Sequence, residues 1–334
     1  MTIPREFGGR DRALLDVVLV IEEIARACGV TARIVVEGNL GTVGALRAYG
    51  TTAQKQRYCP WVLEGDKPAI AITEVEAGSA ATDLATRVDE GAEGYVITGH
   101  KRYITGAGIS RLHLVYARFG DTPGADGIGG LLVERDTPGF RVGRREPMMG
   151  LRGIPEAELH FEQCRVERSQ LLVAPGDGFK KLMRAYNGQR LGAATVALGL
   201  AQGAFERAVA YAAERRQFGR PIGDFQGIRW KLADMALKID AARLLIHRAA
   251  ARAGRDFPDS VDTAKAKTFA AEMAQEVTTQ ALQIHGAAGY GRTLPLERMA
   301  RDARMFTIGG GTVEMMRNLI ADALLPTRAN WRSP

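Results

Sequence analysis

The chain has few of the residues that cross-link a small domain or hold a metal ion. Its 334 residues include three cysteines, Cys28, Cys59 and Cys164, which are widely separated and form no Cys-x-x-Cys pair. This spacing argues against both a disulfide framework and a zinc site. The five histidines show neither the His-x-x-x-His nor the His-Glu-x-x-His spacing of local metal motifs. We therefore expect no metal ion.

Long apolar runs and clustered charge are also missing. No stretch of about 18 apolar residues could span a membrane, and the N-terminal residues lack the charged-then-apolar pattern of a secretory signal. We therefore expect a cytoplasmic protein. The net charge of +7 is spread along the chain, without the basic clusters and interleaved aromatics of a nucleic-acid-binding surface. The excess of positive charge is consistent with binding of an anionic small molecule or cofactor. It is equally consistent with a role in solubility alone.

Hydrophobic periodicity divides the chain into three zones. Apolar residues recur every three or four positions from Asp11 to about Leu63, which predicts helices. From about Pro68 to Leu172, short alternating or β-branched runs separated by turn residues predict an antiparallel β-domain. From Asp177 onward, long helical patterns return, and Gly- or Pro-rich breaks separate them.

This order predicts an α+β multi-domain protein, because it lacks the βαβ alternation of a parallel sheet. We expect an N-terminal helical domain over residues 1–66, a middle antiparallel β-domain over 67–173 and a C-terminal antiparallel four-helix bundle over 174–334. A hydrophobic share of 46% can fill the cores of two or three such domains. In the last domain the expected helices cover residues 178–216, 224–253, 259–285, 296–306 and 312–325.

Five short motifs give the chain a specific resemblance. In order, they are AITEVEAGS (71–79), GHKRYITG (99–106), ERRQFGRPIGDFQ (214–226), QIHGAAGYG (283–291) and ERMARDAR (297–304). Each alone is an ordinary strand, turn or helix end. A nucleotide-binding glycine loop follows a strand and opens a helix. Neither GAAGYG nor the later IGGGTV follows a predicted strand, so we exclude a nucleotide-binding loop at both. Together the five motifs resemble the acyl-CoA dehydrogenase family of flavoproteins over nearly the whole chain.

The resemblance implies FAD as the cofactor. In the family, the first two motifs border the isoalloxazine ring, so the hydroxyls of Thr73 and Thr105 would hydrogen-bond its polar edge. Tyr103 replaces the more usual tryptophan and still offers an aromatic face for stacking. Ser79 would face the pyrophosphate or the CoA.

The resemblance also implies a homodimer or homotetramer, because the family builds each FAD site from two subunits. One segment reaches the neighbouring subunit's FAD, where a guanidinium fits a pyrophosphate. Another contacts the adenine half, where small residues permit close backbone approach. The first segment holds Arg215, Gln217 and Phe218, and the second holds Gln283, Gly286 and Ala287.

The catalytic base of the family is missing from both of its usual positions. Dehydrogenation needs a carboxylate to take a proton from the acyl α-carbon. In the family this is the glutamate of a Tyr-Glu-Gly-Thr stretch, which here reads GGGT and puts Gly310 in its place. Other members place the base on the long helix directly before an arginine, and here Gln189 precedes Arg190. An amide cannot accept a proton at neutral pH.

Members without the glutamate resemble the 3-sulfinopropionyl-CoA desulfinase type, which releases sulfite and leaves propionyl-CoA. We expect this reaction, with Arg33 binding the sulfinate, Gln189 orienting the substrate or a water, and Arg190 beside the active site. A buried guanidinium needs an anionic partner. The alternative for Arg33 is an arginine on the surface, or one paired with Glu37 a helical turn away.

Two other functions stay open. One is an acyl-CoA dehydrogenase that uses water or a carboxylate such as Glu314 as its base and passes electrons to an electron-transfer flavoprotein. The other is a non-catalytic FAD-binding subunit of a mixed dehydrogenase. The resemblance further implies that the chain opens within the N-terminal helical domain, without the first helices of the family.

Overall fold

The computed structural model describes residues 1–326 and contains helices first, then strands, then helices again. The chain folds into two compact units. None of the helices in the described residues is long and apolar enough to cross a membrane. Unit 1 comprises Met1–Ala13, Ile34–Met148 and Arg152–Gln189, and unit 2 comprises Leu14–Arg33, Met149–Leu151 and the residues from Arg190 onward.

Four helices occupy the N-terminal region that the periodicity predicts to be helical. In α1, Val17, Val18 and Ile21 are buried in unit 2, which is the pattern of an amphipathic helix. Helix α4 begins at a capping box in which Thr51 and Gln54 exchange side-chain-to-backbone hydrogen bonds. The helices are α1 (Leu14–Ala27), α2 (Gly29–Glu37), α3 (Thr42–Tyr49) and α4 (Thr52–Leu63).

Unit 1 contains an eight-stranded sheet with the order β6-β7-β3-β2-β4-β5-β8, in which β1 also pairs with β4. Most neighbours are antiparallel, as predicted, but β1 and β2 both run parallel to β4. The prediction of an antiparallel β-domain is confirmed for most of the sheet, and β2 runs parallel to β4 because β3, antiparallel to β2, carries the chain back before β4 begins. The strands are β1 (Ala69–Ala71), β2 (Arg87–Glu90), β3 (Gly94–Thr105), β4 (Leu112–Phe119), β5 (Ile128–Glu134), β6 (Phe140–Arg145), β7 (Glu156–Glu167) and β8 (Leu171–Val173).

The C-terminal helices begin and end close to the predicted breaks. Asp259 caps α7 by accepting hydrogen bonds from the backbone amides of Val261 and Asp262. Gly286, at a φ of 59°, follows the end of the same helix. The helices are α5 (Gly178–Glu214), α6 (Gln226–Ala253), α7 (Ser260–His285), α8 (Ala287–Tyr290), α9 (Leu296–Arg304) and α10 (Val313–Leu324).

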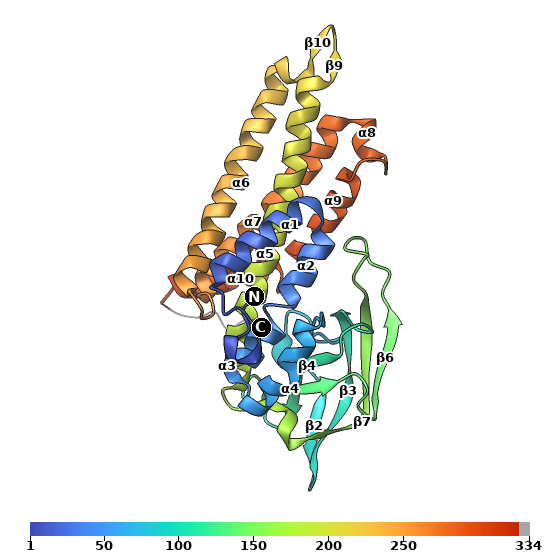
Figure 1. Ribbon diagram of the computed structural model, residues 1–334, viewed down its shortest axis with the longest axis vertical. Coiled ribbons are helices and arrows are strands. Elements are labelled where there is room, and N and C mark those ends of the chain that lie inside the picture. The colour runs from blue at the N-terminus through green and yellow to red at the C-terminus, as the bar shows by residue number, and fades with distance from the viewer. Residues whose placement is uncertain (327–334) are drawn as a thin grey trace. The chain divides into compact units, whose positions relative to one another are not determined.

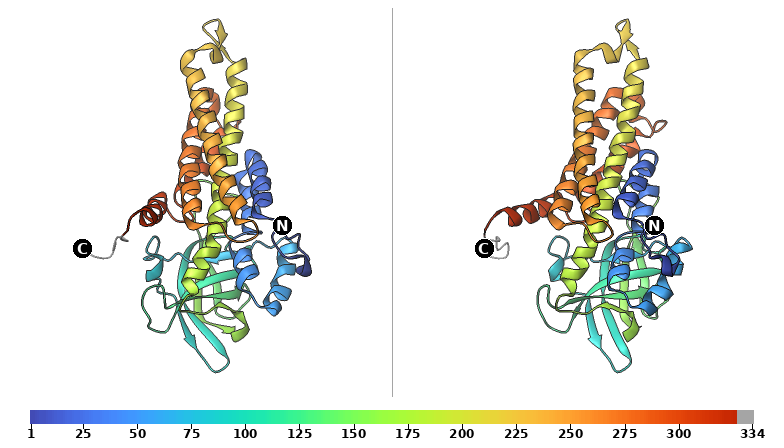
Figure 2. Two further views of the ribbon diagram at one scale, coloured as in Figure 1. Left: turned by 90° about the vertical axis from the view of Figure 1, so that its left-hand side faces the viewer. Right: turned by 60° about the vertical axis from the view of Figure 1, so that its left-hand side comes forward.

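Within unit 2 the long helices pack side by side. Helices α6 and α7 lie alongside each other, and the short hairpin of β9 (Arg216–Gln217) and β10 (Arg220–Pro221) joins α5 to α6 (Figures 1 and 2). Helix α7 also packs against α9 and α10. The domain borders expected after residues 66 and 173 lie in the connections before β1 and α5 and stay a prediction.

Candidate functional site

A buried ion pair holds the loop of the first motif against strand β3 in unit 1. The Lys101 ammonium donates hydrogen bonds to Glu74 Oε1 at 2.7 Å and to the carbonyl of Ile72 at 2.9 Å. Burial lowers the pKa of Lys101 to about 8. Burial alone would raise the pKa of Glu74, but the charge and hydrogen bond of Lys101 outweigh it and lower that pKa. The carboxylate also accepts hydrogen bonds from the amides of Ala85 and Thr86.

Next to this pair, Tyr103 adopts an unusual backbone conformation. Its φ is 56°, in the left-handed region, and a register shift between Lys101 and Ile104 interrupts the pairing of β3 with β7 around it. The Arg102 amide donates to the carbonyl of Thr73 at 2.9 Å, so the loop and this bulge are joined directly. Nearly half of the Tyr103 side chain, 48%, is exposed. The bulge therefore presents an aromatic ring instead of burying it.

The polar residues predicted around a flavin ring are distributed along the same two segments. The Thr105 hydroxyl donates to Glu156 Oε1 at 2.6 Å across the β3–β7 ladder. Ser79 is exposed at the end of the loop, and Thr73 is partly buried. Unit 1 thus brings Thr73, Tyr103 and Thr105 together on neighbouring backbone segments, and this arrangement can contact the face and polar edge of a flat heteroaromatic ligand.

Gln189, the last residue of unit 1, has a buried amide with an unused acceptor. The side chain is only 4% exposed, and Oε1 has no hydrogen-bond partner among the described residues. The oxygen faces Gly41, whose φ is 59°, and a Cβ there would lie 2.7 Å from it. Because a buried carbonyl oxygen without a partner is costly, a water or a ligand is expected to donate to it.

In unit 2, two cations hold the glycines that replace the family's glutamate. Arg190 Nε donates to the carbonyl of Gly310 at 2.9 Å, and the Lys267 ammonium donates to the carbonyl of Gly311. Burial, with the nearby charge of Arg190, lowers the pKa of Lys267 to about 8. The φ angles of Gly310 and Gly311 are 79° and 92°, in the region that favours glycine.

The backbone of Gly310 therefore disfavours the residue that the family places there. A Cβ at this position would meet nothing closer than Arg190 Cγ at 3.8 Å, so space is available. The obstacle is the φ angle, because an L-residue in this region is strained. The backbone conformation of this turn favours glycine. A glutamate at position 310 would have room for its side chain but would strain the backbone.

Glu314 is a poor candidate for a replacement base. It lies in the first turn of α10, is exposed, and has a pKa lowered by hydrogen bonds from its own backbone and from Thr312. A lowered pKa makes a carboxylate a weaker proton acceptor.

Arg33 is buried within α2, at 8% exposure, so the surface alternative for this residue is wrong. In unit 1, Glu37 forms an ion pair with the ammonium of Lys67.

The segments predicted to reach a neighbouring subunit lie at one end of the helices of unit 2. Tyr211 of α5 stacks on His285 of α7 with 4.2 Å between ring centroids, which brings the C-terminal ends of both helices together. The hairpin and α8 lie at this end (Figure 1). Phe218 is 93% exposed at a φ of 51°. The other predicted residues here are also exposed, namely Arg215, Gln217, Gln283, Gly286 and Ala287.

Sequence reasoning missed Lys101, Glu74 and Lys267. Lys267 had a recognisable signal, since it lies in α7 among alanines at helical spacing that are all buried, such as Ala264, Ala270 and Ala271. A lysine on such a face is rarely fully buried without a partner. Its partner, a backbone carbonyl 44 residues away, carries no sequence signal.

Comparisons with known proteins place this geometry in context. Models of the N-terminal, middle and C-terminal domains of acyl-CoA dehydrogenase match residues 1–66, 69–164 and 176–325. A 3-sulfinopropanoyl-CoA desulfinase of Cupriavidus necator is 52% identical over 331 residues, covering 97% of this chain and 84% of that protein. The protein of the same name from Paraburkholderia xenovorans is 51% identical, covering 99% and 86%. The butyryl-CoA dehydrogenase structure from Megasphaera elsdenii aligns with a TM-score of 0.94 at 34% identity, covering 97% and 86%.

Proposed function

Because the chain belongs to the acyl-CoA dehydrogenase family, we propose that it binds FAD and releases sulfite from 3-sulfinopropionyl-CoA, leaving propionyl-CoA. The observation that carries the proposal is the backbone of Gly310, whose positive φ disfavours a glutamate where the family has its base. The other base position holds the Gln189 amide, which cannot take a proton. Relatives of about half-identical sequence carry the name of this reaction.

The residues present fit FAD. The half-exposed Tyr103 ring at a strained φ offers a stacking face, and Thr73 and Thr105 lie on the adjoining segments. Ser79 would face the pyrophosphate or the CoA. When bound, FAD supplies a flat ring that can accept a hydride. A desulfination has no net redox change and does not require this hydride transfer. We propose that the segments at the end of unit 2 contact the FAD of a neighbouring subunit in a homodimer or homotetramer, through Arg215, Gln217, Phe218, Gln283, Gly286 and Ala287.

The proposed reaction balances without an external oxidant or reductant. The carbon–sulfur bond breaks, water adds hydroxide to sulfur to give bisulfite, and a proton goes to the carbon that carried the sulfinate. No electron leaves the substrate, so neither a dehydrogenase base nor an electron acceptor is required. In this assignment Arg33 binds the sulfinate, Gln189 Oε1 accepts a hydrogen bond from a water or the substrate, and Arg190 holds the glycine turn in place.

Sulfite release in the absence of any electron acceptor tests the proposal. The flavin-loaded protein is mixed with 3-sulfinopropionyl-CoA, and sulfite is assayed together with flavin absorbance. We expect sulfite at constant flavin absorbance, with release falling at least tenfold, about 1.4 kcal/mol in barrier, in Arg33→Ala and in Gln189→Ala. Arg26→Ala is the matched control, since Arg26 is a partly exposed arginine paired with Glu23 and Glu206.

Two other outcomes would overturn the proposal. No sulfite, with the flavin bleached by butyryl-CoA, would indicate an acyl-CoA dehydrogenase that passes electrons to an electron-transfer flavoprotein. No reaction with either thioester, together with a co-purifying homologue that carries the glutamate, would indicate a non-catalytic FAD-binding subunit.

A further inference from the structure

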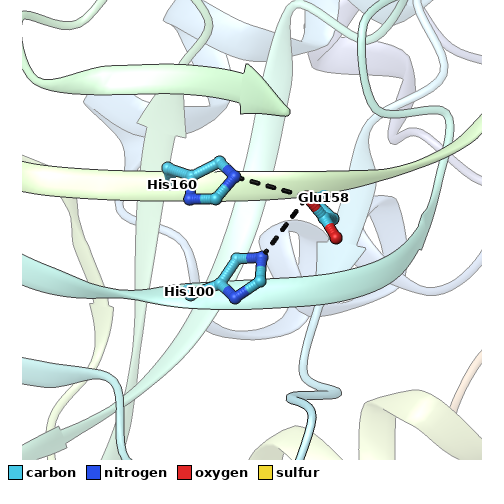
Figure 3. A group of neighbouring side chains, drawn as sticks. All are labelled: His100, Glu158 and His160. Atoms are coloured by element: carbon cyan, nitrogen blue, oxygen red, sulfur yellow. Dashed lines mark ion pairs between the residues drawn. The ribbon is translucent and has the colours of Figure 1, made fainter. Parts of the chain in front are cut away.

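Two histidines and a glutamate meet on neighbouring strands of unit 1 (Figure 3). Glu158 and His160 lie two residues apart on β7, so their side chains project from the same face of the strand. His100 on β3 is the direct cross-strand partner of His160 in the antiparallel register. The backbone ladder thus fixes the positions of all three side chains.

The three ligand-type atoms converge without bonding one another. Nε2 of His160 and Nε2 of His100 lie 3.5 Å and 3.8 Å from the same oxygen, Glu158 Oε2. Both distances are longer than an ordinary N–H···O hydrogen bond. They approach the separation of about 3.4 Å between two ligands of one tetrahedral zinc ion, given metal–ligand distances of about 2.0–2.2 Å. All three atoms lie within 4.8 Å of one another.

His100 Nε2 is buried and has no hydrogen-bond partner among the described residues. The two imidazole rings stack with centroids 4.3 Å apart and planes at 9°. Burial, and then the neighbouring His160, lower the pKa of His100 from its ordinary value. A neutral nitrogen with a free lone pair is the form that binds a metal ion.

A glycine on the neighbouring strand packs directly against His160. Gly143 on β6 has an ordinary backbone conformation, so its φ does not require glycine. A Cβ at this position would lie 2.4 Å from His160 Nε2 and 2.9 Å from Glu158 Cβ. A glycine inside a strand weakens it, and its presence here is explained by the close approach of the His160 imidazole, which it allows to lie beside Glu158.

Two nearby arginines are paired mainly with glutamates. Arg102 Nε lies 2.9 Å from Glu146 Oε1, and Arg144 lies 3.3 Å from the same oxygen. Their guanidinium groups reach Glu158 at 4.0 Å through Oε1, and the backbone amide of Arg144 donates to Glu158 Oε2 at 3.4 Å. The two arginines and the two glutamates balance in charge, and the long hydrogen bond from the Arg144 amide leaves Glu158 Oε2 a second lone pair for a metal ion.

We propose that His100, Glu158 and His160 bind one divalent transition-metal ion of the zinc type, with a fourth coordination position open to water. Two imidazoles with one carboxylate suit zinc and its neighbours and do not suit magnesium or calcium, which take oxygen ligands. The ion would cross-link β3 to β7 three residues before Tyr103, so it would stabilise the strand that carries the predicted flavin contacts. The site is independent of the desulfination proposed above.

Metal titration of the whole protein tests this site. Protein purified without a polyhistidine tag is stripped with EDTA and then titrated with zinc chloride by calorimetry, and with cobalt chloride by visible absorption. We expect one ion per chain, a cobalt spectrum of low-symmetry nitrogen and oxygen ligation, and a higher thermal midpoint with zinc. His100→Ala and His160→Ala should each lower zinc affinity by more than the roughly 10- to 100-fold that loss of an outer-shell partner causes.

Two variants sharpen the test. Gly143→Ala keeps all three ligands and should still weaken binding, because its methyl group takes the space beside His160 Nε2. His247→Ala is the matched control, since His247 Nε2 lies 3.1 Å from Glu22 Oε2 in unit 2 but has no second histidine beside it. Its zinc affinity should equal that of the unmodified protein. Saturable binding that survives both His100→Ala and His160→Ala, or no binding with Kd below about 100 µM, would overturn the proposal.

Discussion

Arg190 Nε donates a hydrogen bond to the carbonyl of Gly310 at 2.9 Å, while Lys267 donates to the next carbonyl, that of Gly311. A partly buried arginine and a buried lysine thus hold consecutive peptide groups of a turn in which both glycines have positive φ. The turn lies where the sequence motif predicts the family's catalytic glutamate. The two base positions differ in backbone conformation, since Gly310 has a positive φ and Gln189 lies in helix α5. We therefore expect opposite results from adding a carboxylate at each of them.

Gly310→Glu should fail to create a dehydrogenase. The φ of 79° strains any L-residue, so we expect the free energy of unfolding to fall by about 1–2 kcal/mol. The carboxylate should not reach a productive position, and butyryl-CoA should leave the flavin of the variant oxidised. Gly310→Ala is the control, since it carries the same strain without the charge. Flavin bleaching by Gly310→Glu at normal stability would contradict this explanation of the turn.

Gln189→Glu should behave differently, because position 189 lies in the regular helix α5 and accepts any L-residue. The new carboxyl group is isosteric with the amide and would be buried, which raises its pKa and makes it a better base. We expect butyryl-CoA to bleach the flavin, because a positioned base contributes about 10²- to 10⁴-fold to a proton transfer, and sulfite release to fall at least tenfold, because a carboxylate repels the sulfinate. Stopped-flow absorbance with a parallel sulfite assay measures both. An oxidised flavin and unchanged sulfite release would show that position 189 does not face the reacting carbons.

Gly41→Ala should displace the Gln189 amide. The added Cβ would lie 2.7 Å from Gln189 Oε1 and 2.8 Å from Ile70 Cδ1, at a φ of 59°. We expect unfolding to require about 1–2 kcal/mol less and sulfite release to fall. Gly65→Ala is the matched control, because Gly65 also has a positive φ, of 107°, but no atom lies near its Cβ position. Equal loss of activity in the two variants would mean that backbone strain alone, and not Gln189, is responsible.

The buried Lys267 predicts how stability depends on pH. Its pKa is about 8 in the folded protein and 10.5 in the reference state, so the unfolded chain holds this proton over a range where the folded chain has released it. Stability therefore rises with pH between about 8 and 10.5 through this group. Relative to Lys267→Met, the unmodified protein should gain up to about 3 kcal/mol across that window. Urea denaturation of both proteins at pH 7.5, 8.5 and 9.5, about one unit apart, checks this, and parallel stability curves would refute it.

Tyr103→Gly should separate backbone strain from flavin binding. Glycine adopts a φ of 56° freely, so the loss of strain offsets the greater flexibility of the unfolded chain, and stability should change by no more than about 1 kcal/mol. The aromatic face is lost, and the purified variant should contain less FAD per chain. Tyr103→Phe keeps the ring and should retain the cofactor. Full FAD occupancy in Tyr103→Gly would show that the ring does not contact the flavin.

Much of the architecture was predictable because its signals are local. The ends of α6 and α7 follow from Gly, Pro and capping residues such as Asp259, and the helical periodicity of each segment depends only on its own residues. The five motifs and the glycines at 309–311 are likewise properties of adjacent residues. They were enough to predict the family, the absence of its glutamate at position 310 and the amide at 189.

Only the tertiary structure determined how those residues are used. The glycine turn at positions 310 and 311 accepts hydrogen bonds from Arg190 and Lys267, which lie on two different helices far from it in sequence. The parallel pairing of β2 with β4 depends on the path of β3. The convergence of His100 with Glu158 and His160 depends on the register of two strands 60 residues apart, which no local spacing encodes. Sequence patterns record short-range preferences, whereas contacts between distant segments arise from the packing of the whole chain.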